Sequence, residues 1–226
     1  MSLKSRANIV RRKIMHTLTH NIGKKSVSEM QKKADRFTVK RVLISRPNHR
    51  LGNMLLITPL VQEIARTFPD CSIDLFVKGK ITPIVFENYP QVHQIIELPK
   101  KPLKEFGAYL KVWFSLKRTN YDLVINVEKG SSSGRISTII APADFKFYGD
   151  DFEELQQKHP DIKHIAKYPV YNFRRFMELL NQKPLTDEIP VLDVKLSAEE
   201  LQNGKKHLEA ITQDSSKKTI AFFAYA

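Results

Sequence analysis

The stretch from Arg41 to Phe68 constrains the fold of this chain more than any other part of the sequence. It begins with a short apolar run, Val42–Ile44, continues through a polar loop over 45–52, and becomes an apolar segment of helical length at Asn53. A buried strand, a loop and a helix in this order form the opening unit of a doubly wound α/β domain. We therefore predict an α/β fold in which loops at the carboxyl ends of the strands bind ligands.

Further apolar runs repeat this unit along the chain. Because the connections between them have the length of helices, the strands should pair in parallel with right-handed crossovers. Proline removes a backbone donor, so Pro59 should either kink the first helix or mark its restart at Thr58. Strands are predicted at 72–77, 94–98, 121–127 and 145–148, and helices at 81–88 (a short helix or turn), 103–116, 136–140 and 170–180.

Two segments carry more specific expectations. The polar, aperiodic residues 149–168 are predicted to form a surface loop. The helix over 103–116 should have an apolar face. That face consists of Leu103, Phe106, Leu110, Val112, Trp113 and Leu116.

The last part of the chain suggests a second domain. An extended connector over 184–195 leads to Ser197 and Glu200, whose spacing predicts a capping box and a helix that runs to about Ile211. The apolar run Thr219–Phe223 then predicts a strand. We expect three regions: a basic leader over 1–40, a Rossmann-like domain over 41–185, and the beginning of a truncated second domain over 186–226.

The positive charge is concentrated in the leader and the first loop. Fourteen lysine and arginine residues stand against two acidic residues in 1–50, so this segment carries +12 of the formal net charge of +13. Apolar residues at helical spacing between Ala7 and Leu18 favour a basic amphipathic helix on an anionic membrane, with residues 1–25 in contact, and a solvated tail fits equally well. Nucleic acid is not expected as a partner, because the basic arm lacks interleaved aromatic residues.

Other classes of protein are disfavoured by what the sequence contains. No run of about eighteen apolar residues predicts a spanning helix. The single cysteine, Cys71, allows no internal disulfide and fits a reducing cytoplasm. His16 and His20 have the spacing of a metal-binding pair but no nearby acid, so we expect surface histidines and no metal.

The first loop has the composition of an anion-binding site. Arg46 and Arg50 supply permanent charge suited to phosphate or carboxylate, and Gly52 allows close approach of a ligand to the start of the helix. Neither G-x-G-x-x-G nor G-x-x-x-x-G-K-[ST] occurs here, which disfavours a nicotinamide dehydrogenase and a kinase. We assign substrate binding to Arg46, Asn48, Arg50, Gly52, Thr58, Gly130, Ser131 and Arg135.

The segment Leu51–Leu60, L-G-N-M-L-L-I-T-P-L, resembles the G-D-x-L-x-T-x-P signature of family 9 glycosyltransferases, the ADP-heptose:lipopolysaccharide heptosyltransferases. The resemblance continues through F-P-D-C-S-I-D-L-F-V at 68–77 and Y-D-L-V-I-N-V at 121–127, and it spans roughly 41–226. It implies a GT-B fold, in which an amino-terminal Rossmann-like domain binds the acceptor and a carboxyl-terminal domain binds the nucleotide-sugar donor. It also implies inverting transfer without a metal or another cofactor.

The chain departs from this family pattern at the residue after Gly52. Family members carry an aspartate there, which is thought to be the general base, whereas this chain has Asn53. An amide cannot take a proton at neutral pH. Three interpretations follow: another carboxylate acts as the base, the acceptor chemistry differs, or catalysis is lost. Glu128, predicted at the end of the fourth strand, is the best substitute for the base by position. The alternative is that Glu128 is an ordinary solvated glutamate without a catalytic role. Asn126 is a second departure, because the family often has aspartate on this strand.

These observations predict a glycosyltransferase of bacterial lipopolysaccharide or surface-glycan synthesis, with Asn53 and Glu128 at its catalytic centre. The partners would be a nucleotide-sugar donor and a lipid-linked or core oligosaccharide acceptor. The protein would be cytoplasmic, at the inner face of the membrane if the leader binds lipid. The 226-residue chain alone should be inactive. The alternative is a non-catalytic glycan- or nucleotide-binding protein with the same fold.

Overall fold

The computed structural model describes residues 26–102, 104–149, 153–212 and 220. The predicted leader helix and His16 and His20 lie outside these residues, as does nearly all of the strand predicted at 219–223. The chain divides into two units, 1–194 and 195–226. In the described part of the chain, no helix is long and apolar enough to cross a membrane.

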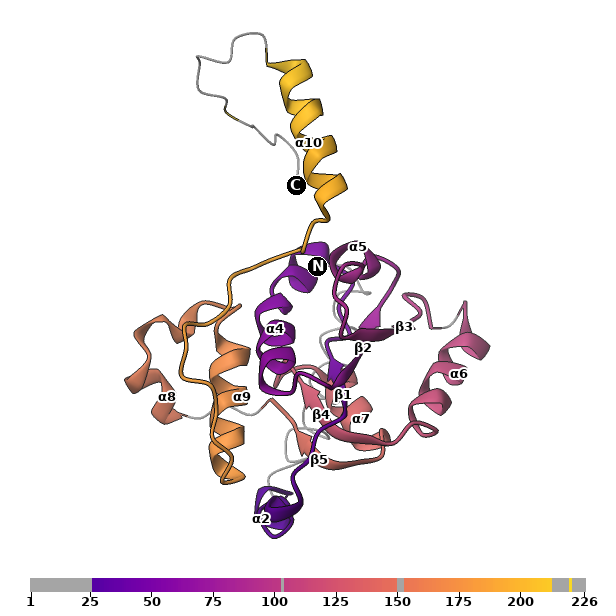
Figure 1. The fold of residues 1–226 in the computed structure, drawn as a ribbon. Helices are drawn as coiled ribbons and strands as arrows, with labels where there is room; N and C mark the ends of the chain where they lie inside the picture. The colour runs from indigo at the N-terminus through magenta and orange to yellow at the C-terminus, as the bar shows by residue number, and fades with distance from the viewer. Residues whose placement is uncertain (1–25, 103, 150–152, 213–219, 221–226) are drawn as a thin grey trace, which may run out of the picture. The chain divides into compact units, whose positions relative to one another are not determined.

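A parallel sheet of five strands forms the centre of the first unit (Figure 1). Its strands lie in the order β3-β2-β1-β4-β5, and all neighbouring pairs are parallel, which confirms the predicted α/β class. The chain winds outward from β1 first in one direction and then, from β4, in the other, so β1 and β4 flank the topological switch point. The strands are β1 (Arg41–Ser45), β2 (Ser72–Lys78), β3 (Val92–Leu98), β4 (Tyr121–Asn126) and β5 (Ala143–Phe147).

Helices connect the strands and cover both faces of the sheet. The first predicted helix is divided in two, and α4 begins at Thr58 with Pro59 in its first turn, where a missing donor does no harm. Of the two sequence alternatives, the structure therefore has the restart. The helices are α2 (Ser26–Gln31), α3 (Leu51–Leu55), α4 (Thr58–Thr67), α5 (Pro83–Phe86), α6 (Phe106–Leu116), α7 (Ser132–Ile140), α8 (Glu153–Lys158) and α9 (Tyr168–Leu179), with short 3-10 turns at Ala34–Arg36 and Pro160–Lys163.

The two faces of the sheet carry cores of different size. Alternating residues of β1 point to opposite sides, so Val42 and Ile44 enter the larger core while Leu43 enters the smaller one. The larger core lies beneath α4 and α9, and the smaller one beneath α6 and the end of α7 (Figure 1). Cys71, just before β2, is buried in the larger core.

A buried ion pair joins α4 to α9. Both carboxylate oxygens of Glu63 accept from Arg174, at 2.6 Å from Nε and 3.0 Å from Nη2. The Glu63 side chain is fully buried, and the Arg174 side chain nearly so. This bidentate pair fixes how the two helices lie against each other over the larger core.

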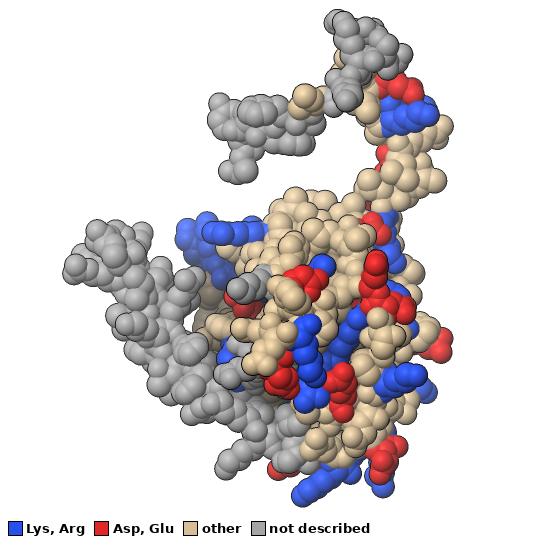
Figure 2. Space-filling view, turned by 90° about the vertical axis from the view of Figure 1, so that its left-hand side faces the viewer, with Lys and Arg blue, Asp and Glu red and all other residues tan. Residues whose placement is uncertain are grey.

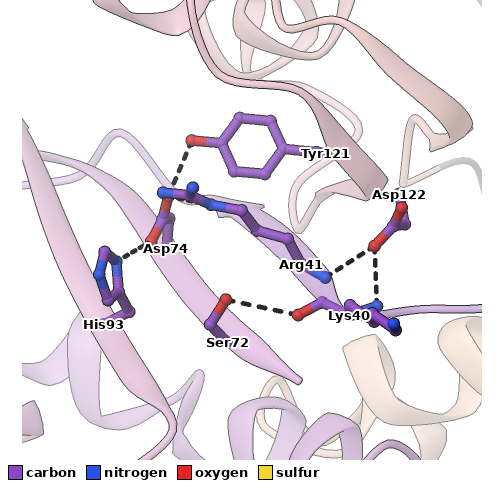
Figure 3. Close-up of polar contacts among 7 residues, drawn as sticks. All are labelled: Lys40, Arg41, Ser72, Asp74, His93, Tyr121 and Asp122. Atoms are coloured by element: carbon purple, nitrogen blue, oxygen red, sulfur yellow. Dashed lines mark hydrogen bonds and ion pairs between the residues drawn. The ribbon is translucent and has the colours of Figure 1, made fainter. Parts of the chain in front are cut away.

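A second buried carboxylate, Asp74, joins residues near the amino-terminal ends of the strands (Figure 3). It accepts from Nε and Nη2 of Arg41, at 3.2 and 2.8 Å, and from the Tyr121 hydroxyl at 3.0 Å, and it contacts Nδ1 of His93 at 3.2 Å. Burial, followed by the Asp74 charge, raises the pKa of Tyr121. Arg41 therefore belongs to a structural cluster, remote from the basic loop that follows β1.

The prediction of a surface loop over 149–168 is wrong. The segment 149–168 contains α8 and the turn at Pro160–Lys163, because single apolar residues such as Leu155 and Ile162 anchor a polar sequence to the interior. The predicted apolar face of the helix over 103–116 is only partly buried, since α6 leaves Phe106 and Leu110 exposed. Apolar residues cover more of that helix than the sheet can contact.

The second unit contains α10 (Ala198–Ile211), and its predicted capping box is present. The Glu200 backbone amide donates to the Ser197 hydroxyl at 3.2 Å, and the Ser197 amide donates to the Glu200 carboxylate at 2.7 Å. The connector belongs to the first unit as far as Val194, and within that unit the Tyr89 hydroxyl donates to the Asp193 carbonyl at 2.7 Å.

Candidate functional site

An ion pair lies at the switch point of the sheet. Arg46 directly follows β1, Glu128 stands two residues after the end of β4, and the guanidinium of Arg46 donates to the carboxylate of Glu128. The Arg46 side chain is 8% exposed and that of Glu128 is 52% exposed, so the pair links the interior to the surface. Ligands of doubly wound sheets bind where the order of the strands reverses. The sequence predicted both residues for a site at this edge, and the fold brings them into contact.

A cavity of about 220 Å³ adjoins this ion pair. Arg46, Glu128 and Gly130 are the predicted site residues that line it, whereas α9 and the turn before it supply a wall that sequence reasoning missed. In the sequence, Pro169 after Tyr168 is typical of the first turn of a helix, and this could have indicated that a helix begins there. The remaining lining residues are Leu56, Ile57, Val127, Lys129, Ile165, Tyr168 and Pro169.

The loop after β4 is held in place by Asn126. Its side-chain amide donates to the carbonyl oxygens of Glu128 and Tyr148, both at 2.8 Å. Gly149 adopts a φ of +70°, and a Cβ there would collide with the Asn126 carbonyl. An aspartate in place of Asn126 would have no donor for either bond. The departure from the family pattern at this position therefore has a structural role in this chain.

The amino terminus of α7 begins at the same loop. Ser131 is the N-cap residue, and its hydroxyl accepts from the Gly134 amide at 3.2 Å. A Cβ on Gly134 would collide with the side-chain oxygen of Asn126, so only glycine allows α7 to approach β4 this closely. Ser131 thus acts on the helix, while Gly130 faces the cavity.

The predicted site residues around α3 lie beside the cavity lining and not within it. Asn48 accepts the Arg50 amide through its side-chain oxygen at 3.1 Å, which shapes the turn before the helix. Arg50 and Gly52 are exposed, and an added Cβ at Gly52 would meet no atom within 4 Å. Asn53 is half-buried in α3.

Two predicted binding residues lie in the interior. The hydroxyl of Thr58, which is buried, donates to the Leu55 carbonyl at 2.8 Å and accepts the Asp193 amide at 3.2 Å. Arg135 is 1% exposed and donates to the Tyr148 carbonyl at 3.2 Å, with its guanidinium 5.5 Å from the centre of the Tyr148 ring. The structure does not bring these side chains to the cavity surface.

Across residues 26–102, 104–149 and 153–212, no three histidine, cysteine or acidic side chains gather as metal ligands would. The polar groups that line the cavity include the guanidinium of Arg46, the carboxylate of Glu128 and the backbone of the loop that carries Gly130.

Part of the chain is similar in sequence to known proteins. No family model matches the chain. Lipopolysaccharide heptosyltransferase 3 of Escherichia coli K12 is 33% identical over 79 residues, which are 34% of this chain and 23% of that protein. The same enzyme from another Escherichia coli sequence is 30% identical over 82 residues, with the same shares. The matched part of the chain thus spans about a quarter of the length of these relatives.

The fold is similar to part of a solved glycosyltransferase structure. The crystal structure of a family 9 glycosyltransferase from Veillonella parvula superposes with a TM-score of 0.51 at 17% identity, over 78% of this chain and 51% of that one. The chain therefore has a Rossmann-like parallel sheet flanked by helices, as in one half of that enzyme. With the sequence match to heptosyltransferase 3, this confirms the resemblance to family 9 glycosyltransferases predicted from Leu51–Leu60.

Proposed function

We propose that the chain carries the acceptor-binding domain of a glycosyltransferase of bacterial lipopolysaccharide or surface-glycan synthesis. The enzyme would transfer a heptose-like sugar from a nucleotide-sugar donor to a lipid-linked or core oligosaccharide, with inversion at the anomeric carbon and without a cofactor. Transfer would take place in the cytoplasm at the inner face of the membrane. The single observation that supports this most is the Arg46–Glu128 pair, which lines a cavity at the switch point of a family 9 type fold.

The reaction needs a group that takes the proton from the attacking acceptor hydroxyl. Glu128 is the carboxylate that lines the cavity, and its half-exposed side chain can reach an acceptor placed there. Arg46 would orient that carboxylate before the acceptor arrives. As the hydroxyl oxygen bonds to the anomeric carbon, the bond to the nucleotide diphosphate breaks and the proton passes to Glu128. Asn53 would orient the hydroxyl by hydrogen bonding.

A non-catalytic glycan- or nucleotide-binding protein is the second candidate, and two observations favour it. Asn53 cannot act as a base, and Glu128 is already engaged by Arg46. In such a protein the ion pair would be a fixed part of the binding surface. Activity and binding assays separate the two candidates.

The test is an assay of the complete gene product with ADP-heptose and a heptose-deficient lipopolysaccharide core, followed by mass spectrometry of the acceptor. Glu128→Gln should lower kcat by about 10² to 10⁴-fold if Glu128 is the base. Glu87→Gln, at an exposed glutamate after α5, is the matched control and should leave kcat unchanged.

Each other outcome has a definite meaning. A Glu128→Gln variant as active as the wild type would remove Glu128 from catalysis. A protein that is inert with a panel of nucleotide sugars, yet binds ADP or core oligosaccharide in calorimetry, would favour the binding protein. We also expect the 226-residue chain to be inactive, and sugar transfer by it would contradict the assignment of the donor site to another domain.

A further inference from the structure

Helix α6 has an apolar surface that the sheet does not use. Tyr109, Val112, Trp113 and Leu116 contact the smaller core, with Trp113 tilted against Phe76 at 5.3 Å between ring centres. On the other side of the helix, three large apolar residues remain open to solvent. Phe106 is 60% exposed, Leu110 is 38% exposed and Phe114 is 58% exposed.

These three residues form one stripe, which we call the α6 stripe. They are spaced by four residues, so they lie along one side of the helix, roughly 12 Å from first to last at 1.5 Å per residue. Isolated exposed apolar residues are ordinary on protein surfaces, whereas two phenylalanines and a leucine in a row mark a contact surface. Figure 1 shows α6 at the side of the sheet opposite to α4 and α9.

The charges near the stripe are predominantly positive. Over 104–118 the sequence has four basic residues and a single acid, Glu105, and all five are exposed. No salt bridge joins any of the four to a carboxylate of the described residues. The four are Lys104, Lys111, Lys117 and Arg118.

The outer surface of α8 and α9 shows the opposite pattern (Figure 2). There, blue and red side chains alternate, because Arg175 pairs with Glu154 at 3.0 Å and with Glu178 at 2.9 Å, and Lys167 pairs with Asp161 at 2.6 Å. On that surface the positive and negative charges neutralise each other and the side chains are polar, as expected of a surface that faces water. The surface of α6 instead has an excess of positive charge and exposed apolar residues.

We propose that the α6 stripe docks on an anionic membrane surface. Phe106, Leu110 and Phe114 would enter the boundary between headgroups and acyl chains, and the surrounding cations would contact anionic headgroups. An amphipathic helix lying in the plane of the membrane needs this combination of an apolar side and basic flanks. A protein partner would also cover apolar residues, but the four exposed basic residues of 104–118 match anionic lipid headgroups better.

The experiment uses the one tryptophan of the chain, Trp113, which lies in α6 itself. Its fluorescence therefore reports on this helix. The protein is mixed with vesicles of phosphatidylcholine alone or with added phosphatidylglycerol, both with and without brominated lipid. We expect bromine quenching of Trp113 with the anionic vesicles only, and its decrease at high salt.

Variants then test the stripe directly. Phe106→Gln with Phe114→Gln should lower the partition coefficient at least about tenfold and abolish the quenching. Ile84→Gln, at a 68% exposed residue of α5, is the matched control and should bind as the wild type does. Lys111→Glu with Lys117→Glu should weaken binding at low salt while keeping the apolar stripe, and circular dichroism verifies that each variant is folded.

Three results would overturn the proposal. The first is binding to anionic vesicles without quenching of Trp113, which would place the contact elsewhere in the chain. The second is equal binding by the wild type and the Phe106→Gln/Phe114→Gln variant, or no binding by either. The third is a dimer that the same two substitutions dissociate, which would make the stripe a protein–protein contact.

Discussion

Asn126 and Tyr148, 22 residues apart in the sequence, are joined by a 2.8 Å hydrogen bond from the side-chain amide of Asn126 to the carbonyl of Tyr148. The same amide donates to the Glu128 carbonyl, so one residue holds the loop that carries Glu128 and the chain that leaves β5. The candidate site is therefore shaped by a residue that does not line the cavity beside the ion pair.

Asn126→Asp should destabilise the first unit by about 3 kcal/mol, because a buried carboxylate would face two carbonyl oxygens with no proton to donate. Urea unfolding followed by circular dichroism measures this loss. Asn120→Asp, at an exposed residue just before β4, is the matched control and should change stability by less than about 0.5 kcal/mol. Equal stability of the two variants would contradict the role assigned to the amide.

Glycine-to-alanine substitutions should have opposite effects at two positions. Gly134→Ala would drive a methyl group into the Asn126 side chain and should destabilise by about 1–3 kcal/mol. Gly107→Ala, in α6 with no atom within 4 Å of the added carbon, should stabilise by about 0.5–1 kcal/mol through helix propensity. Thermal unfolding of both variants is the measurement, and a stabilised Gly134→Ala would refute the close approach of α7 to β4.

The buried pair of Glu63 and Arg174 should be far more sensitive than a surface pair. Glu63→Leu leaves the guanidinium of Arg174 without its partner and should cost about 3–5 kcal/mol. Replacing both residues by leucine should recover much of that loss, which a double-mutant cycle in urea would quantify. Arg175→Gln, which removes two partly exposed ion pairs on the same helix, should cost no more than about 1 kcal/mol.

Stability should fall as the pH rises above about 8.5. Burial raises the pKa of Cys71 to about 11, and burial together with the Asp193 charge raises the pKa of Tyr89 to about 12. Above the ordinary thiol pKa the unfolded chain binds fewer protons than the folded chain, so the free energy of unfolding decreases with pH. Cys71 alone should account for about 1–2 kcal/mol between pH 8 and pH 10.

Urea unfolding at pH 8, 9 and 10 measures this slope. Cys71→Ala lowers stability at every pH by removing a buried side chain, so the comparison is between slopes and not between absolute values. The variant should lose most of the pH dependence below pH 10, because the ordinary tyrosine pKa lies at about 10. A variant with the same slope as the wild type would show that Cys71 is not the titrating group.

Much of the sheet could be predicted from the sequence because its signals are local. Runs such as Val42–Ile44 and Tyr121–Val127 are too short and too apolar for anything but buried strands, and the capping box of Ser197 needs only its own neighbours. Arg46 and Glu128 could be placed at the carboxyl ends of strands for the same reason. Their direct contact could not be predicted from the sequence, because it depends on β1 and β4 being neighbours in the sheet.

The cavity wall supplied by Ile165 and Tyr168 depended on the tertiary structure. The segment before α9 is polar, and one apolar residue per turn is enough to hold it against a core that other segments form. Periodicity is measured within a window, so it misses an element whose anchors are single residues.

The sequence by itself determined the parallel α/β fold, the strand ends at which Arg46 and Glu128 lie, and the presence of Asn53 in place of an aspartate. Only the tertiary structure decided which side chains are inside. Arg135 is buried beneath Tyr148, whereas Phe106 lies in solvent, the reverse of what their chemistry predicts. The reason is geometric: a helix docks through one side, and the position of a residue around that helix decides whether it meets the sheet or the surroundings.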